Sequence, residues 1–385
     1  MDIFKQYITL FLIITIILST PLSTISASSQ NSSILTVSAK AACLVDSDSG
    51  KLIYGKNEGL RMPMASTTKI MTAIIAIESG VPLDTVITVP RESVGIEGSS
   101  IYLSEGEHIS LRALIYGLLL CSANDAAVAI AIYLYGSEEA FVSEMNKKAK
   151  ELSLTNTHFT NPHGLDNDEH YTTAYELAKI MAYCVKNDTF LVISGTQRKV
   201  FPRDDGTTRV MINHNRLLRE DCGVISGKTG FTKRSGRCLV TFSKSSGLSL
   251  ICVTLSAPND WNDHKALYNM ASSYYRRIDI PSLSLEIPVI SGTKSTVSVT
   301  SEPISVTVNN SNSSLIKKIY APRLIYASVK KGEYIGKVDY IYNGKTVASV
   351  PLRADESIDT IKYRFNIFSY IKELILNIKD ILWKK

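Results

Sequence analysis

The sequence lacks several motifs that would each place it in a large class of proteins. It has no Gly-x-Ser-x-Gly elbow, no glycine-rich phosphate-binding loop and no dinucleotide fingerprint. It also lacks a concentrated basic stripe, because 42 Lys and Arg residues are set against 36 Asp and Glu residues. No nucleic-acid partner is therefore expected. The length of 385 residues and the 45% hydrophobic content suffice for two or three folded domains.

The six cysteines lack the spacing of a metal site. None belongs to a Cys-x-x-Cys pair, so zinc ligation is not indicated. Cys43, Cys238 and Cys252 lie in apolar, strand-like runs, where cysteine behaves as a small hydrophobic residue. Buried free thiols are therefore expected in preference to disulfides, although an oxidising compartment would permit either.

The N-terminus lacks an apolar run long enough to cross a bilayer. The run from Ile8 to Leu18 is shorter than the ~20 residues that a membrane-spanning helix needs. A charged start precedes it and small polar residues follow it, which is the order of a secretory signal peptide. We predict that residues 1–27 are cleaved near Ala27 and that the protein is exported. A retained membrane helix is the alternative.

The remaining chain divides by its hydrophobic pattern into three parts. Residues 35–277 alternate β-rich runs with apolar helical segments, which predicts a mixed α/β domain. Residues 278–355 consist of short Val, Ile and Tyr runs, and Asn343-Gly344 is a strong hairpin signal, so a small all-β domain is expected. Residues 356–385 show helical spacing throughout. The apolar stripe of this last part comprises Ile361, Phe365, Phe368, Ile371, Ile375, Ile378 and Leu382.

This C-terminal pattern predicts an amphipathic helix that lies on a membrane surface. Basic residues lie mostly opposite the apolar stripe, and charges recur too often for the helix to span a bilayer. Packing of the helix on the β-domain is the alternative. The basic residues are Lys362, Arg364, Lys372, Lys379, Lys384 and Lys385.

One predicted helix carries a serine and a lysine at a spacing suited to catalysis. Ser66 is expected to open a buried helix that ends near Gly80, and Lys69 follows one turn later. At this spacing the two Cβ atoms lie roughly 5–6 Å apart, so the lysine amine can reach the hydroxyl. Alone the pair is weak evidence, because such spacing also arises at ordinary helix caps.

Two further motifs follow the Ser66–Lys69 pair, and their order along the chain makes a catalytic role for the pair more specific. Ser122-Ala123-Asn124 lies between helices predicted over Leu111–Leu120 and Ala126–Tyr135. Lys228-Thr229-Gly230 precedes a hairpin predicted over 236–243 and 248–256. Together the three motifs resemble the signature of the serine penicillin-binding proteins and β-lactamases.

The resemblance is closest to the D-alanyl-D-alanine carboxypeptidases, the low-molecular-mass penicillin-binding proteins, and covers about residues 36–355. It implies a β-lactamase- or transpeptidase-like domain with a mixed antiparallel sheet. Ala123 and Cys121 depart from the residues frequent at their positions but remove no reacting group. The segments that carry the resemblance are 64–73, 98–103, 116–120, 161–165, 170–174 and 227–232.

The resemblance also implies a role for each motif residue. Ser66 would be the nucleophile, Lys69 the general base and Ser122 a proton relay. Asn124, Lys228, Thr229 and Gly230 would bind substrate. The backbone N–H groups of Ser66 and Phe231 would form the oxyanion hole. The expected substrate is a peptidoglycan stem peptide ending in D-Ala-D-Ala, β-lactams are the expected inhibitors, and neither metal nor cofactor is implied.

Other interpretations of the same chain remain open. A β-lactamase or a D,D-endopeptidase of the same superfamily is the first alternative, and a non-catalytic wall-binding module is the second. Glu151 nearly matches the deacylating glutamate motif of class A β-lactamases, but one extra residue disturbs the spacing. The two histidines and three acids between His163 and His170 could suggest a metal site, but a structural loop is favoured.

Overall fold

The central sheet takes its strands from both ends of the larger domain. The computed structural model describes residues 35–362, 371–376 and 379, and its compact unit begins at Val37. Five antiparallel strands pair in the order β2-β1-β9-β8-β7, which leaves β7 and its Lys-Thr-Gly motif at an edge. They are β1 (Ala41–Asp46), β2 (Leu52–Lys56), β7 (Val224–Thr232), β8 (Gly236–Ser245) and β9 (Leu248–Leu255).

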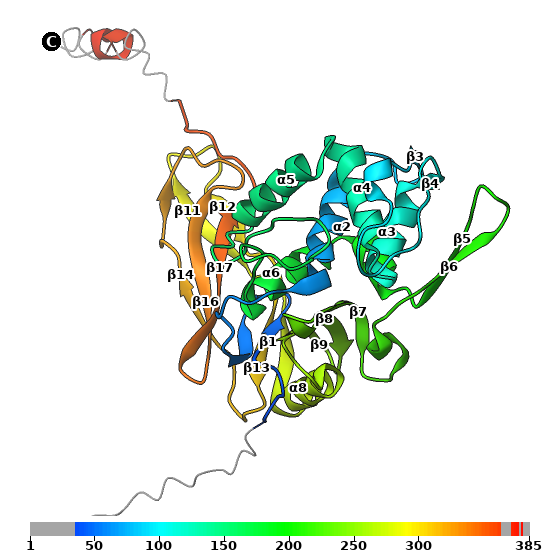
Figure 1. The fold of residues 1–385 in the computed structure, drawn as a ribbon. Coiled ribbons are helices and arrows are strands. Elements are labelled where there is room, and N and C mark those ends of the chain that lie inside the picture. The colour runs from blue at the N-terminus through cyan, green and yellow to red at the C-terminus, as the bar shows by residue number, and fades with distance from the viewer. Residues whose placement is uncertain (1–34, 363–370, 377–378, 380–385) are drawn as a thin grey trace, which may run out of the picture. The chain divides into compact units, whose positions relative to one another are not determined.

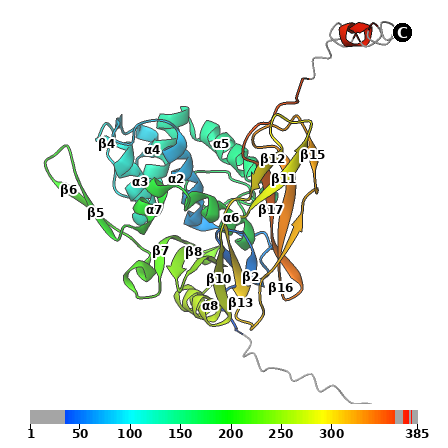
Figure 2. The same ribbon diagram turned by 180° about the vertical axis from the view of Figure 1, so that it is seen from behind.

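Helices cover both faces of this sheet (Figures 1 and 2). Helix α6 packs on β1 and β9, whereas α8 packs on β8 and β9. Successive side chains of β8 therefore point to opposite faces of the sheet. Val240 belongs to the main hydrophobic core, and Thr241 forms a hydrogen bond with His264 of α8. The helices are α2 (Lys69–Glu78), α3 (Leu111–Leu120), α4 (Asn124–Tyr135), α5 (Glu138–Glu151), α6 (Ala174–Cys184), α7 (Asp188–Gly195) and α8 (Asp260–Tyr274).

Shorter elements connect the helices of this domain. The 3-10 turns are η1 (Ala65–Thr68), η2 (Arg91–Ser93) and η3 (Arg216–Arg219). Two small antiparallel ladders pair β3 (Val86–Thr88) with β4 (His108–Ser110), and β5 (Arg198–Pro202) with β6 (Thr208–Ile212). The hairpin of β5 and β6 projects from the body of the domain (Figure 1).

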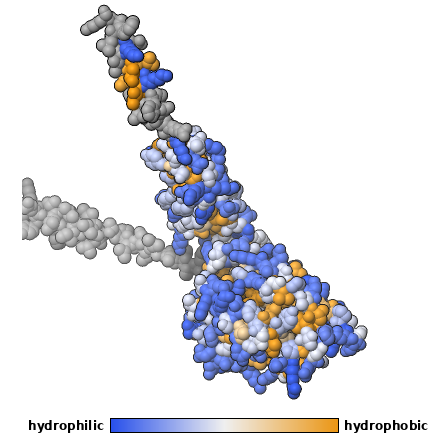
Figure 3. Space-filling model, turned by 90° about the horizontal axis from the view of Figure 1, so that it is seen from above, coloured by the Kyte–Doolittle hydropathy of each residue, from blue (hydrophilic) through white to orange (hydrophobic). Residues whose placement is uncertain are grey.

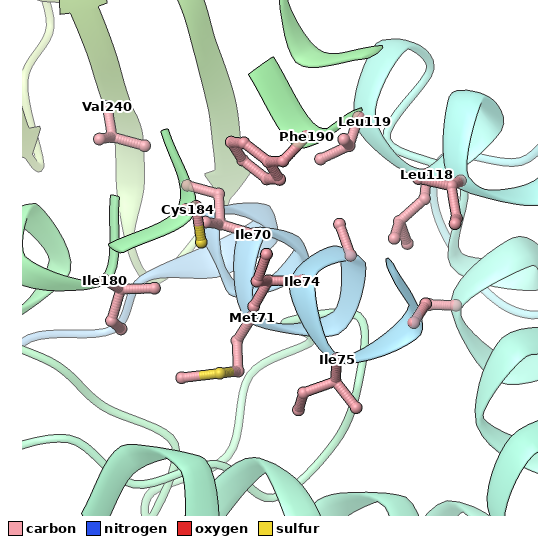
Figure 4. Packing of buried hydrophobic residues seen from close by; sticks show 14 of the residues in the cluster. Ile70, Met71, Ile74, Ile75, Leu118, Leu119, Ile180, Cys184, Phe190 and Val240 are labelled. Atoms are coloured by element: carbon pink, nitrogen blue, oxygen red, sulfur yellow. The ribbon is translucent and has the colours of Figure 1, made fainter. Parts of the chain in front are cut away.

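The main core surrounds α2, the helix that follows Ser66 (Figure 4). Replacing a large side chain in such a core by a small one lowers the free energy of unfolding by roughly 2–5 kcal/mol. The close packing that this cost reflects keeps α2, and therefore Ser66 just before it, in a fixed position. The residues labelled in the figure are Ile70, Met71, Ile74 and Ile75 of α2, Leu118 and Leu119 of α3, Ile180 and Cys184 of α6, Phe190 of α7 and Val240 of β8; each is at most 3% exposed.

The C-terminal domain is all-β, as expected. Strands β10 (Tyr275–Ile280) and β13 (Ile304–Asn309) form one ladder, and six strands pair in the order β14-β16-β17-β12-β11-β15. Asn343-Gly344 is the turn between β16 and β17, with φ of 50° and 72°. The six strands are β11 (Ser284–Ile290), β12 (Thr296–Thr300), β14 (Ile316–Tyr320), β15 (Ile325–Tyr326), β16 (Tyr334–Tyr342) and β17 (Lys345–Ala354).

The two domains share polar contacts, one of them buried. The carboxylate of Asp46, 3% exposed at the end of β1, accepts a hydrogen bond from Thr307 of β13 at 2.5 Å. Lys51 also donates to the Thr307 carbonyl at 2.9 Å. Strand β10 follows α8 directly, so the all-β part begins at Tyr275, three residues before the predicted boundary.

Residues 356–362 are not helical, which corrects the predicted start of the C-terminal helix. Ile358 is 1% exposed, bridges to Val329 and belongs to a core cluster of the β-domain, so burial holds this segment on the sheet. Residues 371–376 are helical and carry apolar and charged side chains together (Figure 3).

Other parts of the terminal predictions lie outside the described residues. These are the signal peptide at 1–27 and, in the C-terminal stripe, Phe365, Phe368, Ile378 and Leu382. Among the residues described, no helix combines the length and hydropathy needed to cross a membrane.

Candidate active site

Ser66 lies in a 3-10 turn, not in the first turn of an α-helix as predicted. The turn η1 leads into α2, which begins at Lys69. Ala65 adopts a left-handed backbone with φ of 46°, a conformation that β-carbons make uncommon. The turn nevertheless keeps the expected spacing, because the Lys69 amine is 3.0 Å from the Ser66 hydroxyl.

The amine of Lys69 is fully buried and has three oxygen neighbours. Besides Ser66 Oγ, it donates to Asn124 Oδ1 at 2.7 Å and to the carbonyl of His163 at 2.5 Å. Lys69 itself is 0% exposed. These contacts bring together residues from α2, α4 and the 161–170 loop. They hold the amine of Lys69 within hydrogen-bond distance of the Ser66 hydroxyl.

Burial determines the protonation of this lysine. Removal from water lowers the pKa of Lys69 well below its usual range, and the nearby Lys228 lowers the pKa further. Burial also lowers the pKa of Lys228 to about 7. The positive charge of Lys228 thus adds to burial in disfavouring the charged form of Lys69. Both effects favour the neutral form of Lys69, which is the form able to accept a proton.

The Ser-Ala-Asn motif connects α3 to α4. Ser122 is 5% exposed and has a left-handed backbone with φ of 61°. Asn124 begins α4 two residues earlier than predicted, because Ala123 is extended and marks the boundary. Its amide nitrogen donates to the Glu97 carbonyl at 2.5 Å, so the side chain links Lys69 to the neighbouring loop.

The Lys-Thr-Gly motif lies on the edge strand β7. Lys228 is 1% exposed, and its amine donates to the carbonyl of Thr229 at 2.8 Å. Gly230 faces η1 so closely that a β-carbon there would be 3.1 Å from the backbone nitrogen of Ser66. Phe231 follows with 65% of its surface exposed. The small residue therefore lets the strand run beside the serine.

A pocket of about 350 Å³ opens at Ser66. Its walls come from the 98–99 loop, the start of α4, the 163–165 loop and the end of β7. The lining residues are Ser66, Gly98, Ser99, Asn124, His163, Gly164, Leu165, Phe231 and Thr232. Ser122, Lys228, Thr229 and Gly230 do not belong to this lining, and Ser122 and Lys228 are buried.

Asp125 fixes one wall of this pocket, a role that the motifs alone did not indicate. Its carboxylate is 1% exposed and accepts hydrogen bonds from Ser100 Oγ at 2.6 Å and from the backbone of Ile101 and Leu103, each at 3.1 Å. The loop that contains Gly98 and Ser99 is thereby tied to α4. Its position directly after the Ser-Ala-Asn motif is the one feature of the sequence that could have indicated this role of Asp125.

The histidine- and acid-rich loop supplies a wall of the pocket. His163 is buried beside Lys69, and desolvation lowers the pKa of His163 to about 3. Asp166 accepts a hydrogen bond from Thr232 of β7 at 2.9 Å. In the described part of the chain, no cluster of three or more His, Cys, Asp or Glu residues could hold a metal ion. Glu151 ends α5.

A serine hydroxyl beside a buried amine of lowered pKa is typical of acyl-transfer enzymes that use lysine as the base. The comparisons agree with this class. Residues 26–259 match the D-alanyl-D-alanine carboxypeptidase family, and residues 282–360 match the C-terminal domain of penicillin-binding protein 5. The chain belongs to the D-alanyl-D-alanine carboxypeptidase family, whose members are serine-type carboxypeptidases.

Named relatives and a solved structure resemble the chain over most of its length. D-alanyl-D-alanine carboxypeptidase DacF of Bacillus subtilis is 31% identical over 342 residues, covering 86% of this chain and 88% of the relative. DacC of Escherichia coli is 30% identical, covering 84% and 85%. Penicillin-binding protein 5 of Haemophilus influenzae has a TM-score of 0.76 at 26% identity, over 84% of this chain and 98% of that one.

Proposed function

We propose that this protein removes the terminal D-alanine from peptidoglycan stem pentapeptides through an acyl-enzyme on Ser66, and that penicillin acylates the same serine. The observation that carries the proposal is the 3.0 Å contact between Lys69 Nζ and Ser66 Oγ at the pocket. The depressed pKa of Lys69 supports it, because a base must be neutral to accept the serine proton.

Acylation follows from the proposed roles. Lys69 takes the hydroxyl proton as Ser66 Oγ attacks the carbonyl between the two D-alanines. The backbone N–H groups of Ser66 and Phe231 receive the negative charge on the carbonyl oxygen. Ser122 passes its proton to the departing nitrogen and takes in exchange the proton held by Lys69, so that D-alanine leaves with a neutral amine and Lys69 is neutral again. Water then cleaves the ester and returns the proton to Ser66.

Substrate binding would use the remaining motif residues. The ammonium of Lys228 and the hydroxyl of Thr229 would hold the terminal carboxylate, and Asn124 the substrate amide. A bound carboxylate favours the charged form of Lys228 and would raise its pKa from the value of about 7. Gly230 lets β7 approach the turn that bears Ser66, so a peptide lying along β7 would be within reach of the hydroxyl.

Product analysis tests the proposed reaction. A stem pentapeptide is expected to lose its terminal D-alanine when it is incubated with the full chain and analysed by mass spectrometry. A crosslinked dimer supplied in parallel tests the endopeptidase alternative. Cleavage of the dimer with an intact pentapeptide would contradict the carboxypeptidase proposal, and loss of D-alanine from the pentapeptide alone would support it.

We further propose that the mature protein works outside the cell, anchored at the outer face of the cytoplasmic membrane by its C-terminal helix. Four apolar side chains of the helical segment 371–376 are 45–53% exposed, which an interfacial helix requires. They are Ile371, Leu374, Ile375 and Leu376.

A truncation tests the anchor. The cut belongs after Lys362, because Ile358 contributes to the β-domain core and a chain ending at Ala354 would lose it. The full chain is expected to sediment with phosphatidylglycerol vesicles, and the chain ending at Lys362 to stay in the supernatant with unchanged hydrolysis of a small peptide. Ile375→Glu in the full chain is the matched control and should weaken sedimentation. Equal sedimentation of all three chains would contradict the proposal.

A further inference from the structure

The backbone just before Ser66 is strained. Ala65 has φ of 46°, and a non-glycine residue keeps such a conformation only where its surroundings hold it in place. The next residue is Ser66, so the direction of the Ala65 carbonyl and the orientation of the serine are coupled through one peptide bond. Groups that hold the Ala65 carbonyl by hydrogen bonds therefore also influence the position of the Ser66 hydroxyl.

A buried side-chain pair holds the Ala65 carbonyl. Thr68 Oγ1 donates to this carbonyl at 2.8 Å and lies 2.7 Å from Nε2 of His170, a residue 102 positions later in the chain. Thr68 is 1% exposed and His170 is 3% exposed. Water does not compete with these contacts, so their geometry is well defined.

The hydrogen-bond pattern fixes the direction of this pair. The backbone N–H of Thr160 can only donate, and it lies 3.0 Å from Nδ1 of His170, so Nδ1 is an acceptor. Burial, with the charges of His158 and Lys69, lowers the pKa of His170 to about 4, so the ring carries one proton. That proton is on Nε2, where it is donated to Thr68 Oγ1. The threonine hydroxyl then has its own proton free for the Ala65 carbonyl.

Gly164 encloses the same carbonyl from the other side. A β-carbon at Gly164 would lie 2.0 Å from the Ala65 oxygen and 2.8 Å from Thr68 Oγ1. Phe159 packs edge-on against the His170 ring, with centroids 5.8 Å apart. The loop that contains both histidines therefore closes directly on the turn that bears the nucleophile.

We propose that His170 is a positioning residue for the nucleophile, acting through Thr68 to hold the Ala65 carbonyl and so to orient Ser66 toward the pocket. The inference rests on the proposed role of Ser66 as the acylated residue. It assigns His170 no contact with substrate and no proton transfer in the reaction.

The test compares acylation rates of full-length variants. Thr68→Val and His170→Leu are expected to lower the rate of acylation by penicillin, and kcat for a peptide, by about 10- to 100-fold, because small misplacements of a nucleophile have effects of this size. KM should stay near the wild-type value, since Lys228 and Thr229 are untouched. Thr68→Ser and His170→Gln keep a donor in place and should retain rates within about threefold.

A second buried histidine–threonine pair provides the matched control. His264 Nδ1 lies 2.7 Å from Thr241 Oγ1, and both residues are 0% exposed on the side of the sheet covered by α8. Thr241→Val should lower the melting temperature about as much as Thr68→Val while acylation stays at the wild-type rate. Should His170→Leu fail to fold, Thr68→Val removes only the hydroxyl and decides the question.

Two results would overturn the inference. One is wild-type acylation by Thr68→Val, and the other is an equal loss of rate in Thr241→Val, which would indicate a general effect of instability. Failure of the proposed function would differ from both, because the wild-type protein would then not be acylated at Ser66 at all.

Discussion

Penicillin is expected to label the wild-type chain once, at Ser66, and the substitution Ser66→Ala is expected to abolish the label. The hydroxyl of Ser66 lies 3.0 Å from the amine of Lys69, and the β-lactam offers a strained amide together with a carboxylate. Loss of a nucleophile of this kind lowers activity by about four orders of magnitude or more. Intact-mass measurement and peptide mapping after incubation provide the readout.

Ser99→Ala is the control for this experiment. Ser99 lines the same pocket, so its loss changes the surroundings without removing the proposed nucleophile. The control should be labelled at Ser66. Label on Ser66→Ala, or activity that a zinc chelator removes, would contradict the serine mechanism. Release of the penicilloyl group should be slow, and rapid turnover of penicillin would favour the β-lactamase alternative.

Lys228→Gln is expected to move the acid limb of the kcat/KM profile to higher pH and to lower activity near neutral pH by about 100-fold. Lys69 acts as a base only when neutral, so activity rises as the pH passes through its pKa. The cation of Lys228 lowers that pKa, and removing the cation raises it again. The rise in activity therefore begins at a higher pH. The substitution also removes the ammonium proposed to bind the terminal carboxylate of the substrate, so KM should rise.

Thermal stability separates this effect from unfolding. A buried amine whose folded-state pKa is depressed binds protons more readily when the chain unfolds, so it lowers stability as the pH falls below the ordinary lysine range. Lys228→Gln should therefore melt at the same temperature as the wild type or higher. Lys228→Arg retains a cation and should keep the acid limb in place. An unmoved limb in Lys228→Gln would show that Lys228 does not set the pKa of Lys69.

Local signals predicted the elements that local interactions determine. The helix over Leu111–Leu120 is confirmed to the residue, and the hairpin of β8 and β9 follows the predicted runs closely. The turn at Asn343-Gly344 was predictable because its left-handed backbone suits those two residues. The contact of Lys69 with Ser66 was predictable for the same reason, since three residues of spacing along a helical turn bring them together.

Two local predictions needed correction because tertiary contacts override helical propensity. Ser66 lies in a 3-10 turn, where the strained Ala65 is enclosed by Gly164 and Thr68. The C-terminal helix does not begin at Glu356, because Ile358, an apolar residue within the segment predicted as helical, is buried in the β-domain. An apolar residue in a helical spacing is equally suited to either environment, so its sequence position alone does not decide between them.

The family, the division into an α/β and an all-β part, and the chemical groups at the three motifs can be read from the amino-acid sequence. The surroundings of those groups depend on how the chain folds. The tertiary structure placed Lys228 near enough to Lys69 to lower its pKa, tied the 98–103 loop to Asp125, and set His170 against Thr68. Residues such as His170 and Thr68 are 102 positions apart, and no periodicity links them. Their contact follows from chain packing around a shared core, which is a property of the whole domain.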